Sequence, residues 1–171
     1  MKAKLLFLTL LVALFAAGCG RSWQTLNENG FSVNMPGKAS KNEQNVASAA
    51  GPITIHLYTL ENKGEGFIVG YSEYPPAVFD AASSDKLLDA ARQGAIANVQ
   101  GQVTNERKIN LGDIPGREIT GNSPSQNVSF TARVYLAKPR MYMLVYSAQP
   151  KDKPISADGT KFLDSFKLSS Q

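Results

Sequence analysis

One thiol and the residues before it are the clearest candidates for chemistry in this chain. Cys19 is the single cysteine among 171 residues, and it follows a basic start and a run over residues 5–17 that is apolar except for Thr9, with small residues at positions 16–18. This order is typical of a secretory signal, in which small side chains let the backbone enter a signal peptidase. The run is shorter than the roughly 20 apolar residues that a membrane-spanning helix needs. We therefore expect residues 1–18 to be a signal peptide, cleaved between Gly18 and Cys19.

The residues around Cys19 resemble the lipobox of bacterial lipoproteins. The motif covers residues 15–19, with Ala16 where the commonest lipobox has Leu. In that family the cysteine sulfur receives a diacylglyceryl group, and the amine exposed by cleavage is usually acylated. The resemblance implies lipid attachment at Cys19 and a bacterial membrane as the first partner. The alternative is an ordinary signal peptide that leaves a free thiol.

The same residues indicate where the protein resides. An exported protein meets an oxidising compartment, where an unpaired thiol such as Cys19 is reactive unless it is modified. The next residue is Gly20, and not the Asp that retains many lipoproteins at the inner of two membranes. We therefore expect a lipid-anchored protein that faces the periplasm or the cell exterior, at the outer membrane if the host has two.

Other residues that could do chemistry are few. His56 is the only histidine, it falls within a predicted strand, and no Gly-x-Ser-x-Gly sequence is present, so we interpret it as a packed or surface residue. Asp85 and Asp89 are four residues apart on a predicted helix and would need further oxygen ligands to hold calcium. We interpret them as part of a solvated helix face. The sequence thus predicts no catalytic residues, no metal site and no cofactor.

The charge of the chain excludes one class of partner. The formal net charge is +4, and it falls to +2 once Lys2 and Lys4 leave with the signal. No run of like charges occurs, so the chain lacks the basic patch that nucleic-acid binding requires. We expect no nucleic acid as a partner and an unidentified envelope protein as the second partner.

Hydrophobic periodicity predicts an α+β fold. We expect residues 19–29 to be the lipidated cysteine and a tether, and residues 30–171 to form one domain. Apolar and polar residues alternate in several segments, as in half-buried strands, and two segments have the apolar stripe of a helix. The prediction is an antiparallel sheet of about six to seven strands with two main helices packed on it. The predicted strands are 31–35, 52–60, 67–74, 102–110, 117–120, 128–136 and 141–148, and the helices are 83–100 and 156–167.

One face of the predicted sheet gathers tyrosines. If Lys138-Pro139 is the whole loop of the last hairpin, Tyr135 pairs with Tyr142 on the face that also carries Arg133 and Tyr146. Tyr58 and Tyr71 could line the same face. An uncovered face of this kind would bind a partner, a glycan or an acyl chain. Under the closing helix, the same rings would instead be core residues, which is the interpretation we favour.

The order of elements is similar to the PsbP-like group of small α/β/α sandwiches, and in particular to DcrB-like bacterial lipoproteins. The matching segments are 30–36, the helix 87–99, 108–112, the hairpin 128–148 and the last helix. The resemblance implies a non-enzymatic accessory or binding role at a membrane, and it brings no catalytic residues. Two alternatives stay open, which are a small apolar ligand held between helix and sheet, and an enzyme with an atypical site.

Overall fold

The described part of the chain forms two antiparallel sheets and three helices. The computed structural model describes residues 22–28, 30–48 and 51–169. The strand order is β3-β4-β5-β9-β8-β7-β6 in the seven-stranded sheet and β1-β2-β10 in the small sheet. The elements are β1 (Gln24–Glu28), β2 (Phe31–Met35), β3 (Ser40–Ser48), β4 (Gly51–Asn62), β5 (Glu65–Glu73), α1 (Pro76–Ala81), α2 (Ser84–Asn98), β6 (Gln102–Leu111), β7 (Ile114–Ser123), β8 (Val128–Ala137), β9 (Arg140–Ala148), α3 (Ala157–Asp164) and β10 (Lys167–Leu168).

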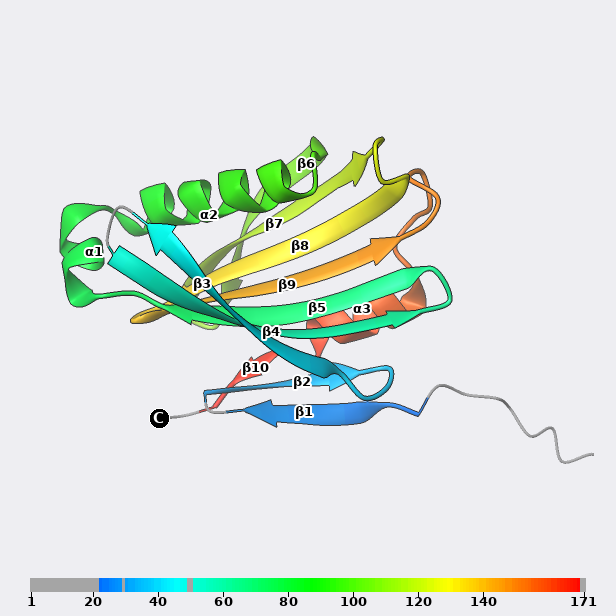
Figure 1. Cartoon of the computed structure of the whole chain (residues 1–171), viewed down its shortest axis with the longest axis horizontal. Helices are drawn as coiled ribbons and strands as arrows, with labels where there is room; N and C mark the ends of the chain where they lie inside the picture. The colour runs from blue at the N-terminus through cyan, green and yellow to red at the C-terminus, as the bar shows by residue number, and fades with distance from the viewer. Residues whose placement is uncertain (1–21, 29, 49–50, 170–171) are drawn as a thin grey trace, which may run out of the picture.

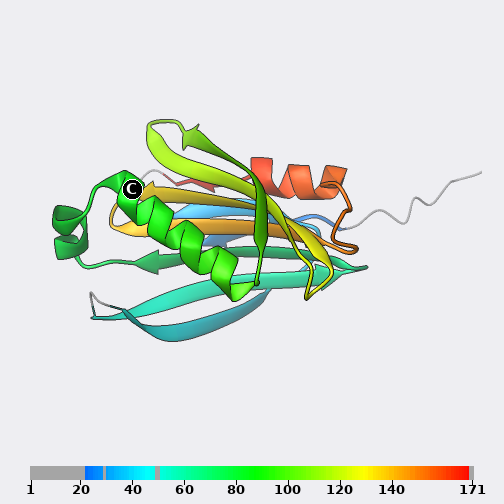
Figure 2. The same ribbon diagram turned by 90° about the horizontal axis from the view of Figure 1, so that it is seen from above.

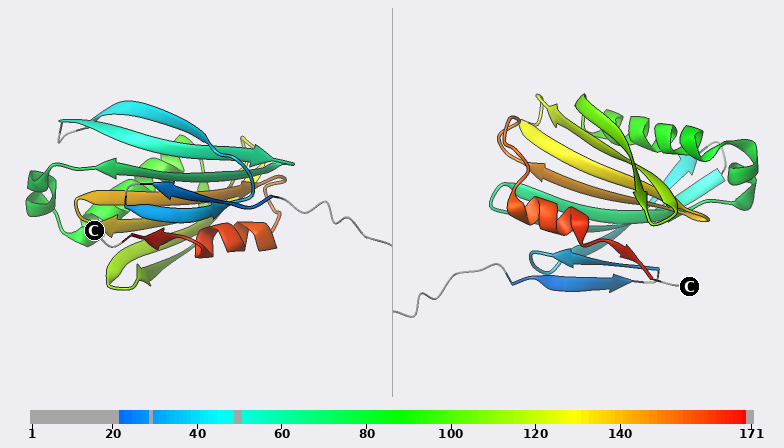
Figure 3. Two further views of the ribbon diagram at one scale, coloured as in Figure 1. Left: turned by 90° about the horizontal axis from the view of Figure 1, so that it is seen from below. Right: turned by 180° about the vertical axis from the view of Figure 1, so that it is seen from behind.

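The elements stack in three layers around the large sheet. Helix α2 packs on one face, over β7 and β8, while α3 packs on the opposite face, against β9 and β2 (Figure 1). Seen from above, α2 crosses one half of the sheet, and β3 and β4 form the other edge (Figure 2). Figure 3 shows α3 beside the small sheet on the far face. The predicted α+β architecture, an antiparallel sheet covered by helices on both faces, is confirmed.

The larger of the two hydrophobic clusters lies between the large sheet and the layer formed by β2 and α3. Phe31, Val33 and Met35 alternate along β2 and are at most 1% exposed. They meet Phe162 and Leu163 of α3, which are also fully buried. Each such side chain contributes about 1.5–3 kcal/mol by leaving water. The alternation visible in the sequence therefore identifies the strand that closes this side of the core.

Two serines begin the two long helices. The Ser83 Oγ accepts a hydrogen bond from the Lys86 N–H at 3.4 Å, and the Ser156 Oγ accepts one from the Gly159 N–H at 3.0 Å. Such caps satisfy N–H groups that have no partner within the helix. Both helices therefore begin where the sequence predicted them, and each ends a few residues earlier than predicted.

The register of the last hairpin is also the predicted one. Tyr135 lies opposite Tyr142, and Val134 lies opposite Met143. A two-residue loop fixes which residues face each other, and the alternating pattern then fixes which face each side chain takes.

Two segments differ from the sequence prediction. No strand is predicted between residues 36 and 51, but Ser40–Ser48 forms β3, an edge strand paired with β4. Its sequence is polar because its residues 40–46 are largely exposed, and backbone hydrogen bonds, which any residue but proline supplies, hold it in place. The expected tether is shorter than predicted, since Gln24–Glu28 forms β1 and Trp23 packs against the core, with the Lys161 Nζ 4.0 Å from the centre of its ring.

Candidate functional site

An apolar groove lies between α2 and the outer strands of the large sheet. Its volume is about 540 Å³, and none of the described residues that line it carries a charge. It forms because α2 covers β7 and β8 while the opposite edge of the sheet, β4 and β3, makes a separate wall (Figures 1 and 2). This volume falls within the range of about 300–1,000 Å³ typical of sites for small molecules.

The wall on the side of α2 is built from small residues. Leu87, Ala90, Ala91, Gly94 and Ala95 line it, at the helical spacing that puts them on one side of α2. A Cβ placed on Gly94 would have no atom within 4 Å, so the groove beside the helix is open there. Small residues such as these commonly allow a helix to lie close to a sheet. Here Gly94, which has no side chain, instead leaves open space between the helix and the far wall of the groove.

The floor of the groove comes from the middle strands. Met141 and Met143 of β9 and Val134 of β8 face it, together with Gly70 and Ser72 of β5. A Cβ on Gly70 would lie 2.7 Å from the Leu57 Cδ2 and 2.8 Å from the His56 carbonyl oxygen, so glycine is required for the strands to approach there. Methionine is flexible and polarisable, which lets such a floor adapt to different apolar shapes.

The far wall and one end complete the groove. Ile53, Ile55 and Leu57 alternate along β4 and form the far wall, with Val46 of β3 beyond them. Tyr74 and Val78 lie at the end where the chain leaves β5 and enters α1. These three residues lie in the predicted strand 52–60, and their spacing of two puts them on one face of it.

The tyrosines proposed as ligand contacts lie on the opposite face of the sheet from the groove. Tyr135, Tyr142 and Tyr146 are at most 4% exposed, beneath the layer of β2 and α3. Tyr135 stacks on Phe166 with ring centres 5.7 Å apart, and burial raises its pKa despite the nearby Arg133. In this structure these rings are core residues, as the favoured interpretation had it, and they do not form an open binding face.

Arg133 has a structural role on that same face. Its Nε donates to the Glu118 Oε2 at 2.7 Å, and its Nη1 lies 2.8 Å from the Asp164 Oδ1 at the end of α3. Burial alone would lower the pKa of Arg133, but hydrogen bonds from its guanidinium to Glu118 and Asp164 outweigh burial and raise it. The arginine therefore fastens α3 to β7 and β8.

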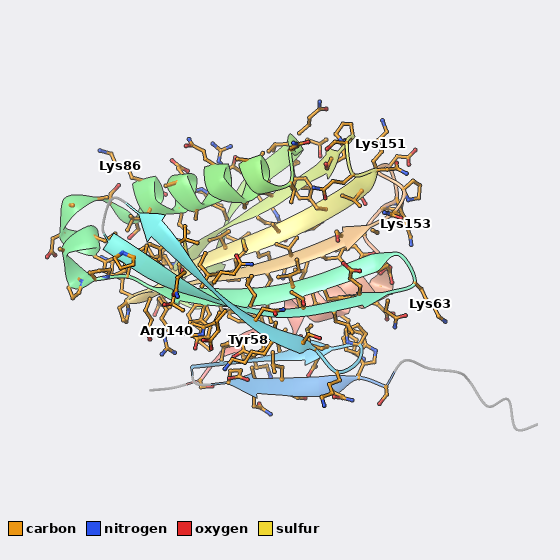
Figure 4. All side chains as sticks on the ribbon, in the orientation of Figure 1. Tyr58, Lys63, Lys86, Arg140, Lys151 and Lys153 are labelled. Carbon is orange, nitrogen blue, oxygen red and sulfur yellow. The ribbon has the colours of Figure 1, made fainter. Side chains whose placement is uncertain are left out.

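His56 is a partly exposed side chain held by two neighbours. Its ring stacks on Tyr71 with centres 4.5 Å apart, and its Nδ1 lies 3.1 Å from the Glu43 Oε1 on β3. The Tyr71 ring also contacts Arg140, whose guanidinium carbon lies 4.9 Å from the centre of that ring. Figure 4 shows Arg140 and Tyr58 on the side of the sheet that faces the small sheet, away from the groove. His56 thus joins β3 to β4 and meets no described nucleophile.

Asp85 and Asp89 both face Arg117 in this structure. Asp85 Oδ1 accepts a hydrogen bond from the Arg117 Nη2 at 2.7 Å, while Asp89 lies 3.5 Å from the same nitrogen. This hydrogen bond and one from Lys108 hold the pKa of Asp85 below its usual value. Both carboxylates are about half exposed, in line with the solvated helix face that we expected. Within the described ranges no group of three His, Cys, Asp or Glu side chains is placed to hold a metal ion.

The residues of the proposed anchor are not part of the described structure. Gly18 and Cys19 lie outside the described residues, so the signal, the cleavage site and the lipid remain predictions. Among the helices formed by residues 22–28, 30–48 and 51–169, none is long and apolar enough to cross a membrane.

Comparison with solved structures identifies the fold class. The solution structure of cyanobacterial PsbP (CyanoP) from Synechocystis sp. PCC 6803 matches with a TM-score of 0.59 and 14% identity, over 89% of this chain and 96% of that one. The fold is therefore PsbP-like, as the order of elements predicted. The crystal structure of PA94, a protein of unknown function from Pseudomonas aeruginosa, covers 76% of this chain and 85% of its own at 13% identity, but its TM-score of 0.36 is too low to establish a shared fold. No protein-family model and no curated protein matches the chain.

Proposed function

We propose that this chain is a lipid-anchored, non-catalytic accessory or binding module of a bacterial envelope. The observation that carries the binding role is the apolar groove beside α2. Apolar surface left concave and open to solvent is typical of a site that a ligand or partner covers. Asp85 and Arg133, which we considered as a metal ligand and as a ligand contact, instead form ion pairs that hold α2 and α3 in place.

The anchor in this proposal is lipid on Cys19, exposed when residues 1–18 are removed. One acyl chain holds a protein only marginally, whereas two or more hold it stably. Because β1 begins at Gln24, only residues 20–23 separate the lipidated residue from the first strand. At about 3.5 Å per residue, those residues span at most on the order of 15 Å. The folded domain would therefore stay close to the lipid surface, at the outer membrane if the host has two.

Metabolic labelling with an alkyne-bearing fatty acid tests the anchor. We expect the wild-type chain to incorporate the label and to carry the mass of the lipid on its first residue. The Cys19→Ser variant should lose the label, because serine has no sulfur to form the thioether. Label that persists in the serine variant, or a purified chain with the mass of the bare processed polypeptide, would refute the proposed attachment.

The second component of the proposal is an envelope protein as partner. Crosslinking in intact membranes, followed by isolation of the chain, tests it. A chain that reproducibly emerges without any crosslinked protein would count against an accessory role in a complex.

A small apolar ligand is the second candidate, and the groove favours it. Its volume of about 540 Å³ and its apolar lining suit a small molecule without requiring a protein partner. Native mass spectrometry of the chain distinguishes the two candidates, since a bound small molecule adds a discrete mass that no protein subunit would give.

A further inference from the structure

We propose that the groove beside α2 binds a single acyl chain of a fatty acid or a membrane lipid. This inference rests on the binding role proposed above and names the chemical class of the ligand. Three properties of the groove support it, which are its lining, its size and one hydroxyl on its floor.

The lining suits a hydrocarbon chain. The groove is lined mainly by aliphatic side chains and two methionines, together with Ser72 and two tyrosines, Tyr71 and Tyr74, and none of its described residues carries a charge. A peptide or a sugar would bring polar groups that need partners, and burying them without hydrogen bonds is costly. A hydrocarbon chain needs none, and Met141 and Met143 can adapt to it.

The size favours a slim chain over a helix of a protein partner. An α-helix with side chains is about 10–12 Å wide and rises about 5.4 Å per turn, so one turn occupies on the order of 400–600 Å³. The groove, with about 540 Å³, has room for little more than one turn. At roughly 30 Å³ for each group of the size of a water molecule, the same space holds on the order of 18 such groups. That is the range of a long acyl chain.

Ser72 supplies a polar contact on the floor of the groove. Ser72 lines the groove and is 8% exposed. Its hydroxyl makes no side-chain hydrogen bond among the described residues. A carboxyl or ester oxygen at the end of an acyl chain would accept a hydrogen bond from this hydroxyl. The geometry therefore points to a ligand with a long apolar part and one oxygen-bearing end.

The first described residues of the chain lie on the other side of the sheet from the groove. Trp23, four residues after Cys19, packs against Lys161 of α3, on the face of the sheet opposite the groove. We therefore expect the acyl chain to come from a separate lipid or fatty acid, and not from Cys19.

Photocrosslinking of the full chain in phosphatidylcholine vesicles tests the proposal. The two probes are a palmitic acid that carries a diazirine and an alkyne, and a phosphatidylcholine that carries the same acyl group. After illumination, peptide mapping by mass spectrometry locates the adducts. We expect them to concentrate in the peptides that hold residues 87–95 of α2 and 141–143 of β9. Labelling by the fatty acid alone would identify the free acid as the ligand, and labelling by both probes would show that a lipid's acyl chain also enters.

Matched variants connect the adducts to the groove. Gly94→Trp places a ring in the open space and should reduce labelling of these peptides at least tenfold. Gln93→Trp adds the same ring on the exposed side of the same helix and should change labelling less than twofold. Ser72→Ala should reduce labelling by the fatty acid about two- to tenfold, the range expected for one hydrogen bond. Thermal unfolding shows whether each variant is folded. We expect Gly94→Trp to fold, because it replaces glycine, which is unfavourable inside a helix.

Two results would overturn the proposal. One is adducts that avoid these peptides with both probes, as expected if the groove takes a segment of a protein partner. The other is equal labelling of the wild type and a folded Gly94→Trp variant. The same peptide map reports the mass of the peptide that begins at Cys19, so failure of the anchor and failure of the groove are separate results.

Discussion

The Tyr146 hydroxyl donates a hydrogen bond of 2.7 Å to the Glu65 carboxylate, and both side chains are buried. The two residues lie on the neighbouring strands β9 and β5. The same hydroxyl lies 3.0 Å from the Oγ of Ser156, the cap of α3. Because a buried carboxylate without donors is costly, this tyrosine connects the centre of the large sheet with the start of the closing helix.

Replacing that hydroxyl should weaken the whole domain. We expect Tyr146→Phe to lower the free energy of unfolding by about 1–3 kcal/mol, because Glu65 loses a buried donor. Urea unfolding followed by circular dichroism measures it. Tyr74→Phe is the control, since the Tyr74 hydroxyl makes no hydrogen bond among the described residues, and it should change the free energy by less than about 0.5 kcal/mol. Equal effects of the two substitutions would contradict this role for Tyr146.

The parts of the fold that the sequence predicts are those in which local pattern and tertiary packing agree. Phe31, Val33 and Met35 alternate, and β2 buries all three. Ser83 and Ser156 precede apolar stripes at helical spacing, and both cap helices. In these segments the residues that the sequence pattern predicts to be buried are the ones that are buried in the structure.

Other parts depend on neighbours that no local pattern reveals. Strand β3 is polar because it is an edge strand, and only its pairing with β4 shows that it is a strand. The groove depends on the separation between α2 and β4, which the packing of the sheet sets over residues distant in sequence. The spacing of Ala91 and Gly94 predicted which side of the helix carries small residues, but not that this side would be left open.

Two substitutions of Arg117 separate the contribution of packing to the stability of the domain from the contribution of charge. Arg117 is buried under α2, with its Nη2 2.7 Å from Asp85 and its Nε 3.6 Å from the Glu106 Oε1. We expect Arg117→Ala to lower the free energy of unfolding by about 2–3 kcal/mol, because it leaves a cavity beneath α2. Arg117→Met fills the space, and the exposed carboxylates can rehydrate, so it should cost less than about 1 kcal/mol.

Chemical denaturation of the two variants measures the difference. Equal losses for Arg117→Ala and Arg117→Met would show that the ion pairs dominate, contrary to this expectation. Adding salt should affect the wild type little, since Arg117 is screened less than an exposed charge.

Glu118 should make stability depend on acidic pH. Burial alone would raise its pKa, but hydrogen bonds from Arg133 and Arg107 outweigh burial and hold the pKa below its ordinary value of 4.5. A carboxyl whose pKa is lower in the folded state stabilises above its unfolded pKa, and this stability is lost as the pH falls through the folded pKa. We expect Glu118 to account for about 1 kcal/mol of the stability lost on acidification, since exposed Arg107 is partly screened.

The comparison that isolates this effect is the wild type against Glu118→Gln. The free energy of unfolding should fall less steeply for Glu118→Gln as the pH drops below about 4.5. Parallel curves for the two proteins over this range would contradict the assignment to Glu118.

Two helix glycines should respond oppositely to the same added methyl group. A Cβ on Gly94 of α2 would have no atom within 4 Å, so Gly94→Ala should raise the free energy of unfolding by about 0.5–1 kcal/mol through helix propensity. A Cβ on Gly159 of α3 would lie 2.7 Å from Tyr146 ring atoms, and this ring is buried and cannot move aside. Gly159→Ala should therefore lower the free energy by about 1–3 kcal/mol despite the same gain in propensity. Thermal and urea unfolding of both variants check the signs, and a stabilised Gly159→Ala would show that α3 does not approach β9 this closely.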